Sequence, residues 1–315
     1  MISIPIAVCG DDWVNQDTVT KQLQEINSQN PVVLDLHAEG PSLHALGIVD
    51  VVQQYLKKFN QNSNCVHVIN WSNSVENIPF QRLNRHVLSH FFWYSDQYVN
   101  SVPVHRTAKH LLGYFVGRRT VPRCVMLKEL QQHHGDKSLL SLMHTVADFK
   151  RSQLDPLSHW CNTDEFDQWW RTVSIASLDG HTVRDQYSGN HNTNASLLTW
   201  YSDFDLELVA ETYCHGDTFF VTEKTVRPMV AGKSMLVYGP TNYLERLRNL
   251  GFRTWHSIWD ESYDQLTGAA RWHAIKNIIN DLVRMDQEQL YRRCLPIVQH
   301  NQQQAQLLAN QHRPE

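Results

Sequence analysis

The sequence is poor in the features that mark several specialised classes of protein. It has only six cysteines in 315 residues, and none are spaced as a CxxC pair, which excludes a disulfide-built scaffold. No run approaches the ~20 apolar residues of a membrane-spanning helix. Charged residues make up 19%, while 10 Trp, 11 Tyr and 11 Phe are present, so the chain is not disordered. A net charge of -4 disfavours a dedicated nucleic-acid coat.

The length predicts two domains, at about 150 residues for each. The first residues lack a basic segment and reach Asp11 and Asp12 at once, unlike a signal peptide. We therefore expect free thiols in a reducing compartment and a cytoplasmic location.

Short Val- and Ile-rich runs alternate with helical patterns along the whole chain, which is typical of an α/β fold. In the first part we expect helices after Gln16, after an N-cap at Ser42 and over 80–90. The expected strands there are 4–9, 31–37, 65–70 and 90–94. In the second part we expect strands 111–116, 206–212, 234–238 and 252–258, and helices 123–133, 138–148, 164–171, 222–231, 242–249 and 269–311.

The expected organisation is an N-terminal α/β acceptor-side domain (1–105), a C-terminal α/β domain (106–285) and a helical tail (286–315). We expect two Rossmann-like domains that face a cleft, with the C-terminal helices packing across it. Pro296 predicts a kink or break in the last helix.

The densest group of chemically useful residues begins at Thr222, where a helix is expected to start. Thr222 can cap that helix, Glu223 lies in its first turn, and Lys224 and Arg227 place positive charge beside its free amides. Such a helix end suits a diphosphate. The alternative is an ordinary capping box with surface charges behind it.

A second basic group, Arg118, Arg119 and Arg123, follows the expected strand 111–116. Ligands of open α/β sheets bind at the carboxyl ends of strands, so this turn could hold an anion. A solvated basic turn is the alternative. The sequence contains neither a Walker loop nor GxGxxG.

The run Phe220-Val221-Thr222-Glu223-Lys224, followed by a strand that ends in Tyr238-Gly239, resembles the donor-binding motif of family-ten glycosyltransferases, the α-1,3/1,4-fucosyltransferases. The run from Glu211 to Tyr263 is also similar to uncharacterised proteins of large phages and marine viruses. The resemblance covers about residues 108–135 and 205–265. Over residues 1–105 the match is only at the level of overall shape.

The resemblance implies two Rossmann-like domains of the GT-B arrangement, with a nucleotide diphosphate sugar bound in the C-terminal one. It implies that Lys224 and Arg123 hold the diphosphate. We place Arg119, Thr222, Glu223 and Arg227 at the same site, and Tyr238 and Gly239 beside the nucleotide. The strand before Lys224 departs from the family in lacking its Asn-Ser pair, so the donor need not be GDP-fucose. Glu211 there could contact a ribose or be structural.

An inverting transferase needs a base to deprotonate the acceptor hydroxyl. We select Glu39, just past an expected strand end, although it could instead be a charge near the next helix. Asp203 and Asp205 form an Asp-x-Asp pattern that could hold a metal, but they precede their strand. The pairs His86/His90 and His133/His134 have no evident third ligand, and Trp169 and Trp170 could contact an acceptor or lie in the core.

We therefore expect a metal-independent glycosyltransferase that needs no cofactor beyond its nucleotide sugar. Its acceptor would be a carbohydrate or a modified base. The alternatives are a glycosyltransferase acting on phage DNA bases and a non-catalytic GT-B-like binding protein. A membrane span is not expected.

Overall fold

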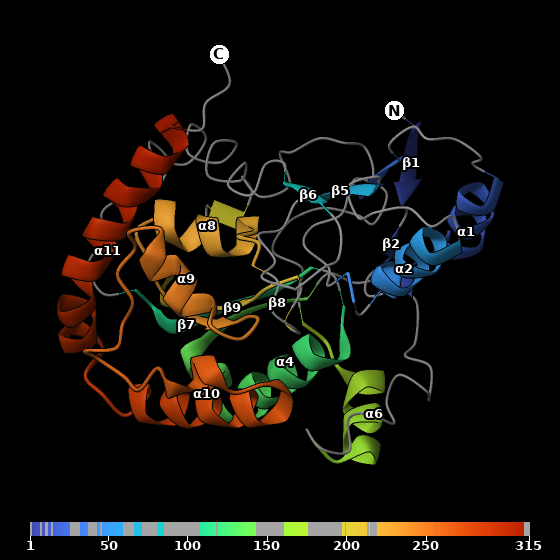
Figure 1. The fold of residues 1–315 in the computed structure, drawn as a ribbon. Helices are drawn as coiled ribbons and strands as arrows, with labels where there is room; N and C mark the ends of the chain where they lie inside the picture. Colours follow the sequence, from blue (N-terminus) through green and yellow to red (C-terminus); the bar gives the residue numbers. More distant parts are fainter. Residues whose placement is uncertain are drawn as a thin grey trace.

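The computed structural model describes most of the C-terminal part of the chain and the main elements of the N-terminal part (Figure 1). The described residues are 2–6, 8–9, 12–13, 15–25, 32–36, 43–44, 46–58, 66–70, 81–84, 108–117, 119–142, 161–175, 197–198, 200–212, 214 and 219–311.

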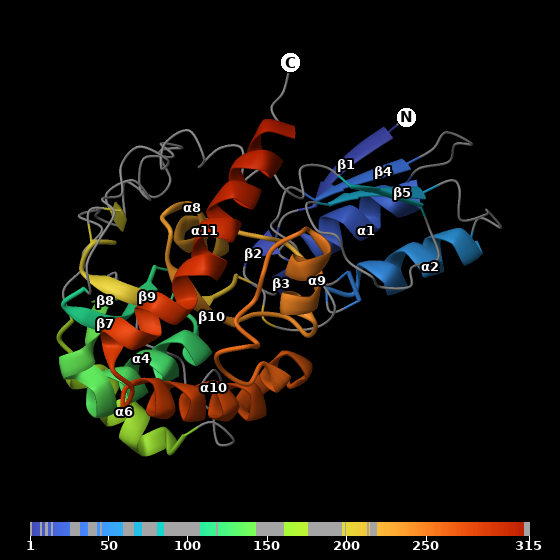
Figure 2. The same cartoon turned by 90° about the vertical axis from the view of Figure 1, so that its left-hand side faces the viewer.

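The N-terminal part is built on a four-stranded parallel sheet whose order, β1-β4-β5-β6, follows the chain. Its helices α1 and α2 cover one face (Figure 2), where Val19 and Leu23 pack with Leu34 and Leu36. Two short strands, β2 and β3, pair antiparallel. The elements are β1 (Ile2–Ile6), β2 (Val8–Cys9), β3 (Asp12–Trp13), α1 (Gln16–Glu25), β4 (Val32–Leu36), α2 (Ile48–Lys58), β5 (Val66–Asn70) and β6 (Gln81–Asn84).

The C-terminal part is built on a second parallel sheet, of order β10-β9-β7-β8, which does not follow the chain. Every residue of β9 and β10 is buried, as expected for strands covered on both faces. The elements are β7 (His110–Val116), α4 (Val121–His134), the 3-10 turn η2 (Gly135–Lys137), β8 (Ser138–Leu142), α6 (Thr163–Thr172), β9 (Phe204–Ala210), α8 (Glu223–Val230), β10 (Ser234–Tyr238), α9 (Tyr243–Asn249), the 3-10 turn η5 (Ser262–Gln265), α10 (Gly268–Leu282) and α11 (Gln287–Gln311).

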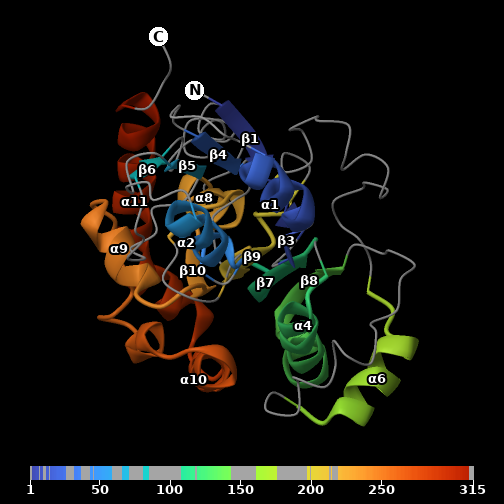
Figure 3. The same cartoon turned by 45° about the vertical axis from the view of Figure 1, so that its right-hand side comes forward.

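Helices cover this second sheet on both faces: α4 and α10 lie on one side, and α8 and α11 on the other (Figures 1 and 3). Side-chain amides of α11 fasten it to the rest of the domain. Gln302 donates to the carbonyl of Val230 at the end of α8, and Asn301 bonds both the amide and the carbonyl of Arg253. The Gln-rich tail is therefore a packed helix up to Gln311, and Pro296 lies inside it without ending it.

The predicted α/β class with parallel sheets is confirmed, but four predicted elements are wrong. The expected helix 269–311 is two helices, α10 and α11, and the break lies at residues 283–286 instead of at Pro296. Residues 81–84 and 138–142 form parallel strands instead of helices, and 252–258 form turns instead of a strand. Helix α2 begins at Ile48, after a turn in which Gly47 has φ +73°, so Ser42 is not its N-cap.

The ends of two predicted helices are confirmed. Thr222 is the N-cap of α8, and Gly251, at φ +87°, follows the end of α9 as a C′ glycine. The domain boundary near residue 105 stays a prediction, as do the cleft and the packing of the C-terminal helices across it, because residues 85–107 lie outside the described part. The predicted strand 90–94 and the His86/His90 pair lie there too. None of the described helices is long and apolar enough to span a bilayer.

Candidate functional site

The order of the C-terminal sheet creates one position suited to a ligand. From β7 the chain runs through α4 to β8 on one side, whereas β9 and β10 continue on the other side of β7. The connections therefore diverge at the carboxyl ends of β7 and β9, and α4 and α8 begin there on opposite faces. In open α/β sheets, ligands bind at such a switch point.

The N-terminus of α8 is held in a fixed position at this edge. The Thr222 hydroxyl accepts a hydrogen bond from the Lys224 amide at 3.2 Å and donates one to the Glu211 carboxylate at 2.5 Å. Glu211 directly follows the last residue of β9, Ala210. One threonine thus caps the helix and attaches it to the strand end.

The Glu211 carboxylate is buried and surrounded by neutral donors. Besides Thr222, it accepts hydrogen bonds from the Thr225 hydroxyl at 2.5 Å and the Tyr243 hydroxyl at 2.8 Å, and from the amide of Thr212. Buried carboxylates need such bonds to offset their lost hydration. Between the two alternatives for Glu211, these contacts favour the structural one.

Lys224 is the cationic side chain on the first turn of this helix. Its Nζ contacts the Glu223 carboxylate at 2.5 Å and the Thr212 hydroxyl at 3.1 Å, just past the end of β9. The side chains of Lys224 and Glu223 are 19% and 17% exposed. An ammonium, the first-turn amides and the positive end of the helix dipole therefore lie together at the switch point.

Arg123 reaches the same edge from α4, in which it is the third residue. Its guanidinium is buried and donates to the carbonyls of Ala210 and Glu211 at 2.9 and 2.7 Å. It thereby ties the start of α4 to the end of β9 and brings a second positive charge to the switch point. The N-cap of α4, Thr120, makes no side-chain cap hydrogen bond.

Arg227, one turn further along α8, lies in a different environment from Lys224. It donates to the Glu207 carboxylate and to the Tyr201 hydroxyl, both at 3.0 Å, and it is buried. Tyr201 also donates to Glu207. Burial raises the pKa of Glu207, and the nearby Arg227 opposes that rise. Arg227 thus serves as the partner of a buried carboxylate in the middle of β9, and the predicted contact with a diphosphate has no support from its geometry.

The remaining predicted residues have packing contacts. Arg119 lies over the Trp170 ring at 5.4 Å, and Trp169 is in the core with its indole bonded to Gln131. Tyr238 is buried, with its hydroxyl 3.4 Å from the carbonyl of Gly268. A Cβ on Gly239 would lie 3.1 Å from the Tyr243 ring, so this glycine allows Tyr243 to approach. Glu39 and Arg118 lie outside the described residues.

Sequence reasoning missed four residues that shape this region: Tyr201, Glu207, Thr225 and Tyr243. Burial raises the pKa of Tyr243, and the neighbouring Glu211 raises it further, so the hydroxyl stays protonated and donates. Its position, 32 residues after Glu211, left no local signal. Glu207 and Arg227 lie 20 positions apart, and this spacing did not predict that they form an ion pair.

The Asp-x-Asp pattern lies far from the switch point, at the amino end of β9. Asp205 accepts a hydrogen bond from Gln287 at 2.6 Å and is buried. Across the described ranges, no three His, Cys, Asp or Glu side chains are grouped to hold a metal ion.

No family model matches the chain, and no curated protein sequence matches it. Among solved structures, the apo structure of OtsA is similar at 10% identity and a TM-score of 0.41, over 100% of this chain and 73% of that one. A sucrose-phosphate synthase from Thermosynechococcus elongatus is similar at 15% identity and a TM-score of 0.43, over 94% and 68%. Likeness at this level carries no argument about activity, which has to come from the site.

Proposed function

We propose that this protein is a glycosyltransferase that binds a nucleotide diphosphate sugar at the carboxyl edge of β7 and β9. The observation that carries the proposal is the position of Lys224. Its ammonium lies on the first turn of α8, beside Thr212 at the end of β9, where the sheet connections diverge. The motif around Thr222, at the N-terminus of α8, resembles the donor-binding motif of family-ten glycosyltransferases and supports the same ligand.

The diphosphate would replace Glu223 as the partner of Lys224. The diphosphate carries two negative charges where the Glu223 carboxylate carries one, and it would lie at the positive end of the α8 dipole. Arg123 would act beneath this site, since its guanidinium already holds the end of β9 in place. In this arrangement Lys224 contacts the donor, and Arg123 and Glu211 position the elements that carry it.

The proposed reaction transfers a sugar to a hydroxyl acceptor. The acceptor oxygen forms a bond to the anomeric carbon as the bond from that carbon to the diphosphate oxygen breaks. Negative charge then grows on the leaving diphosphate, where the Lys224 ammonium stabilises it by direct contact and the buried charge of Arg123 stabilises it from beneath the site. The acceptor proton passes to a carboxylate base, for which we retain Glu39 as the candidate. Cationic side chains would thus neutralise the leaving group without a metal.

The proposed acceptor is a carbohydrate, and the alternative is a modified DNA base. Affinity for DNA that falls steeply with salt would favour the DNA-base alternative. A protein that binds the nucleotide sugar without turnover would fit the non-catalytic alternative.

A nucleotide-sugar screen tests this proposal. The thermal unfolding of the full chain is measured in the presence of GDP-, UDP- and CMP-sugars. In a separate assay, release of the free nucleotide is measured with candidate acceptors. A ligand at 100 times its dissociation constant should stabilise the fold by ~2.7 kcal/mol. Lys224→Ala should abolish the stabilisation and the release, whereas Lys137→Ala, a change at an exposed lysine beyond α4, should alter neither. No stabilisation by any nucleotide sugar would contradict the proposal.

A further inference from the structure

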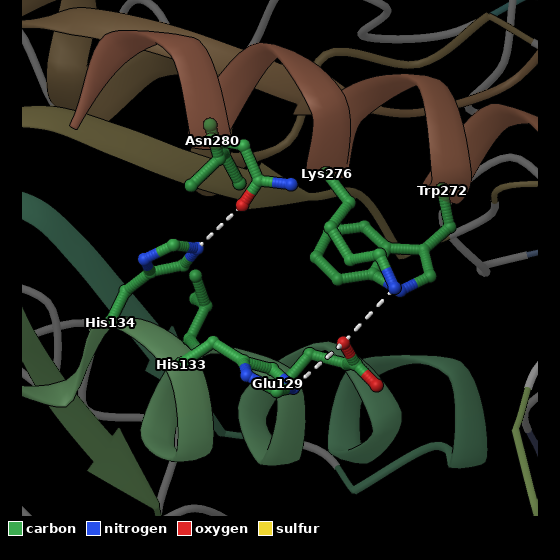
Figure 4. A pocket seen from close by; sticks show the side chains of 8 residues that line it. Glu129, His133, His134, Trp272, Lys276 and Asn280 are labelled. Carbon is green, nitrogen blue, oxygen red and sulfur yellow. Dashed lines mark hydrogen bonds and ion pairs between the residues drawn. The ribbon is translucent and has the colours of Figure 1, made fainter. Parts of the chain in front are cut away.

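A pocket of about 360 Å³ lies between α4 and α10, away from the switch point. Its residues come from the second half of α4 and from most of α10, whose side chains point toward one another across the space (Figure 4). The eight lining residues are Glu129, Leu130, His133, His134, Trp272, Lys276, Ile279 and Asn280. The volume lies within the usual range for sites that bind small molecules.

The pocket has an apolar base and a polar lining. Leu130, Trp272 and Ile279 belong to the buried core of the domain, and each is about 1% exposed. Polar side chains bridge the two helices above them: Lys276 Nζ contacts Glu129 at 3.2 Å, and His134 Nε2 contacts Asn280 Oδ1 at 3.0 Å. This combination of an apolar surface with a few placed polar groups is characteristic of ligand pockets.

The polar groups favour an anion. Among the lining residues, Lys276 and the two histidines can carry positive charge, and one residue can carry negative charge. Glu129, the one carboxylate among the lining residues, already contacts both Lys276 and His133. Because Asn280 turns its Oδ1 to His134, its amide nitrogen faces Lys276 (Figure 4). Lys276 and the Asn280 amide nitrogen are thus two neighbouring donors from α10, whereas the Glu129 carboxylate already has two partners.

We propose that this pocket binds a small organic anion, with its carboxylate at Lys276 and Asn280 and an apolar ring or chain beside Trp272 and Leu130. The ligand would share Lys276 with Glu129, so the ion pair that now bridges α4 and α10 becomes part of the binding site. The site is separate from the donor site proposed above, since Arg123 lies at the opposite end of α4.

Benzoate serves as the probe, with benzyl alcohol as its neutral counterpart. Each is titrated into the full chain while the indole N–H signal of Trp272, assigned with Trp272→Phe, is followed by NMR. We expect a saturable shift with benzoate and at least about tenfold weaker binding of benzyl alcohol, equivalent to ~1.4 kcal/mol.

Three variants decide the role of charge. Lys276→Met should weaken benzoate binding at least about tenfold, corresponding to the loss of one charge-assisted hydrogen bond. Glu129→Gln should strengthen it, because the change removes the competing carboxylate and releases Lys276. Lys137→Met removes the same charge from an exposed position outside the pocket and should leave binding unchanged. The absence of a saturable shift, equal binding of benzyl alcohol, or weaker binding in Glu129→Gln would overturn the proposal. None of these measurements involves a nucleotide.

Discussion

Two buried carboxylates four residues apart, one on β9 and one directly after it, meet the same helix, α8, in different ways. Glu207, in the middle of the strand, is 2% exposed and faces the Arg227 guanidinium and the Tyr201 hydroxyl. Glu211, at the strand end, is 1% exposed and is surrounded by hydroxyls from Thr222, Thr225 and Tyr243. One carboxylate has a cation as partner, and the other has neutral donors.

The Glu207 group is a cross-link within the core, whereas the Glu211 group supports the candidate site. In the core, Glu207 forms an ion pair with Arg227, the cationic residue of the second turn of α8. The Glu211 group fixes the first turn through hydroxyls and leaves the cation of that turn, Lys224, at the edge of the sheet. Lys224 thus lies at the edge of the sheet while the buried acid beneath it, Glu211, is satisfied by hydroxyl groups.

The largest expected effect concerns the ion pair. Arg227→Met should lower the free energy of unfolding by about 3–5 kcal/mol, because it leaves Glu207 charged and unpaired in the core. Urea denaturation measures this loss. The double variant Glu207→Gln with Arg227→Met removes both charges and should recover most of it. If the free energy of unfolding of Arg227→Met lies within ~1 kcal/mol of the wild-type value, the Glu207–Arg227 pair is not a cross-link.

Glu211→Gln should have the next largest effect. A side-chain amide brings an N–H group toward the hydroxyls that now donate to Glu211, so about 1–3 kcal/mol of stability should be lost. Since these hydroxyls fix the first turn of α8, the affinity for a nucleotide diphosphate should fall as well. Equal affinity in the variant and the wild type would contradict the positioning role.

Tyr243→Phe removes one of the donors to Glu211 and should cost about 1 kcal/mol by urea denaturation. Tyr238→Phe is its matched control, since the contact of that hydroxyl with the Gly268 carbonyl is long, at 3.4 Å. A larger loss in the control than in Tyr243→Phe would contradict the assigned network.

The smallest effect is a pH dependence of the ion-pair group. Burial raises the pKa of Glu207, so the folded state binds that proton more tightly than the unfolded state does. The stability that this group contributes is present below its ordinary pKa and is lost as the pH rises through the raised one. Relative to the neutral double variant, the wild type should therefore become less stable as the pH rises above the ordinary glutamate pKa of about 4.3, as measured by urea denaturation. A difference that grows with rising pH would contradict it.

Strong local patterns made the strands and ends around α8 predictable from the sequence. Met235–Tyr238 is a continuous apolar run that ends at Gly239 and Pro240, and Thr222 has the chemistry of an N-cap. Ser138–Leu142 has too few residues to separate a strand from a helix, and pairing with β7 decides it. In 252–258 the expected strand is absent because the Arg253 amide bonds Asn301 of α11 and Trp255 starts a turn.

The candidate site was predictable only where its residues are close together in the sequence. Lys224 follows directly from the residues around Thr222. The separation of Lys224 from Arg227 depends on Tyr201 and Glu207, and the anchoring of Glu211 depends on Tyr243. These are tertiary contacts between residues 20 to 32 positions apart, which no periodicity records.

The affinity of Lys224→Ala for a nucleoside diphosphate tests the central claim most directly. Calorimetry with GDP and UDP compares the wild type, Lys224→Ala and the control Lys137→Ala. Loss of one charge-assisted contact of about 1.5–3 kcal/mol predicts binding at least about tenfold weaker in Lys224→Ala, with an unchanged urea midpoint. If Lys224→Ala binds the nucleotide as tightly as the wild type does, the diphosphate is not held at the start of α8.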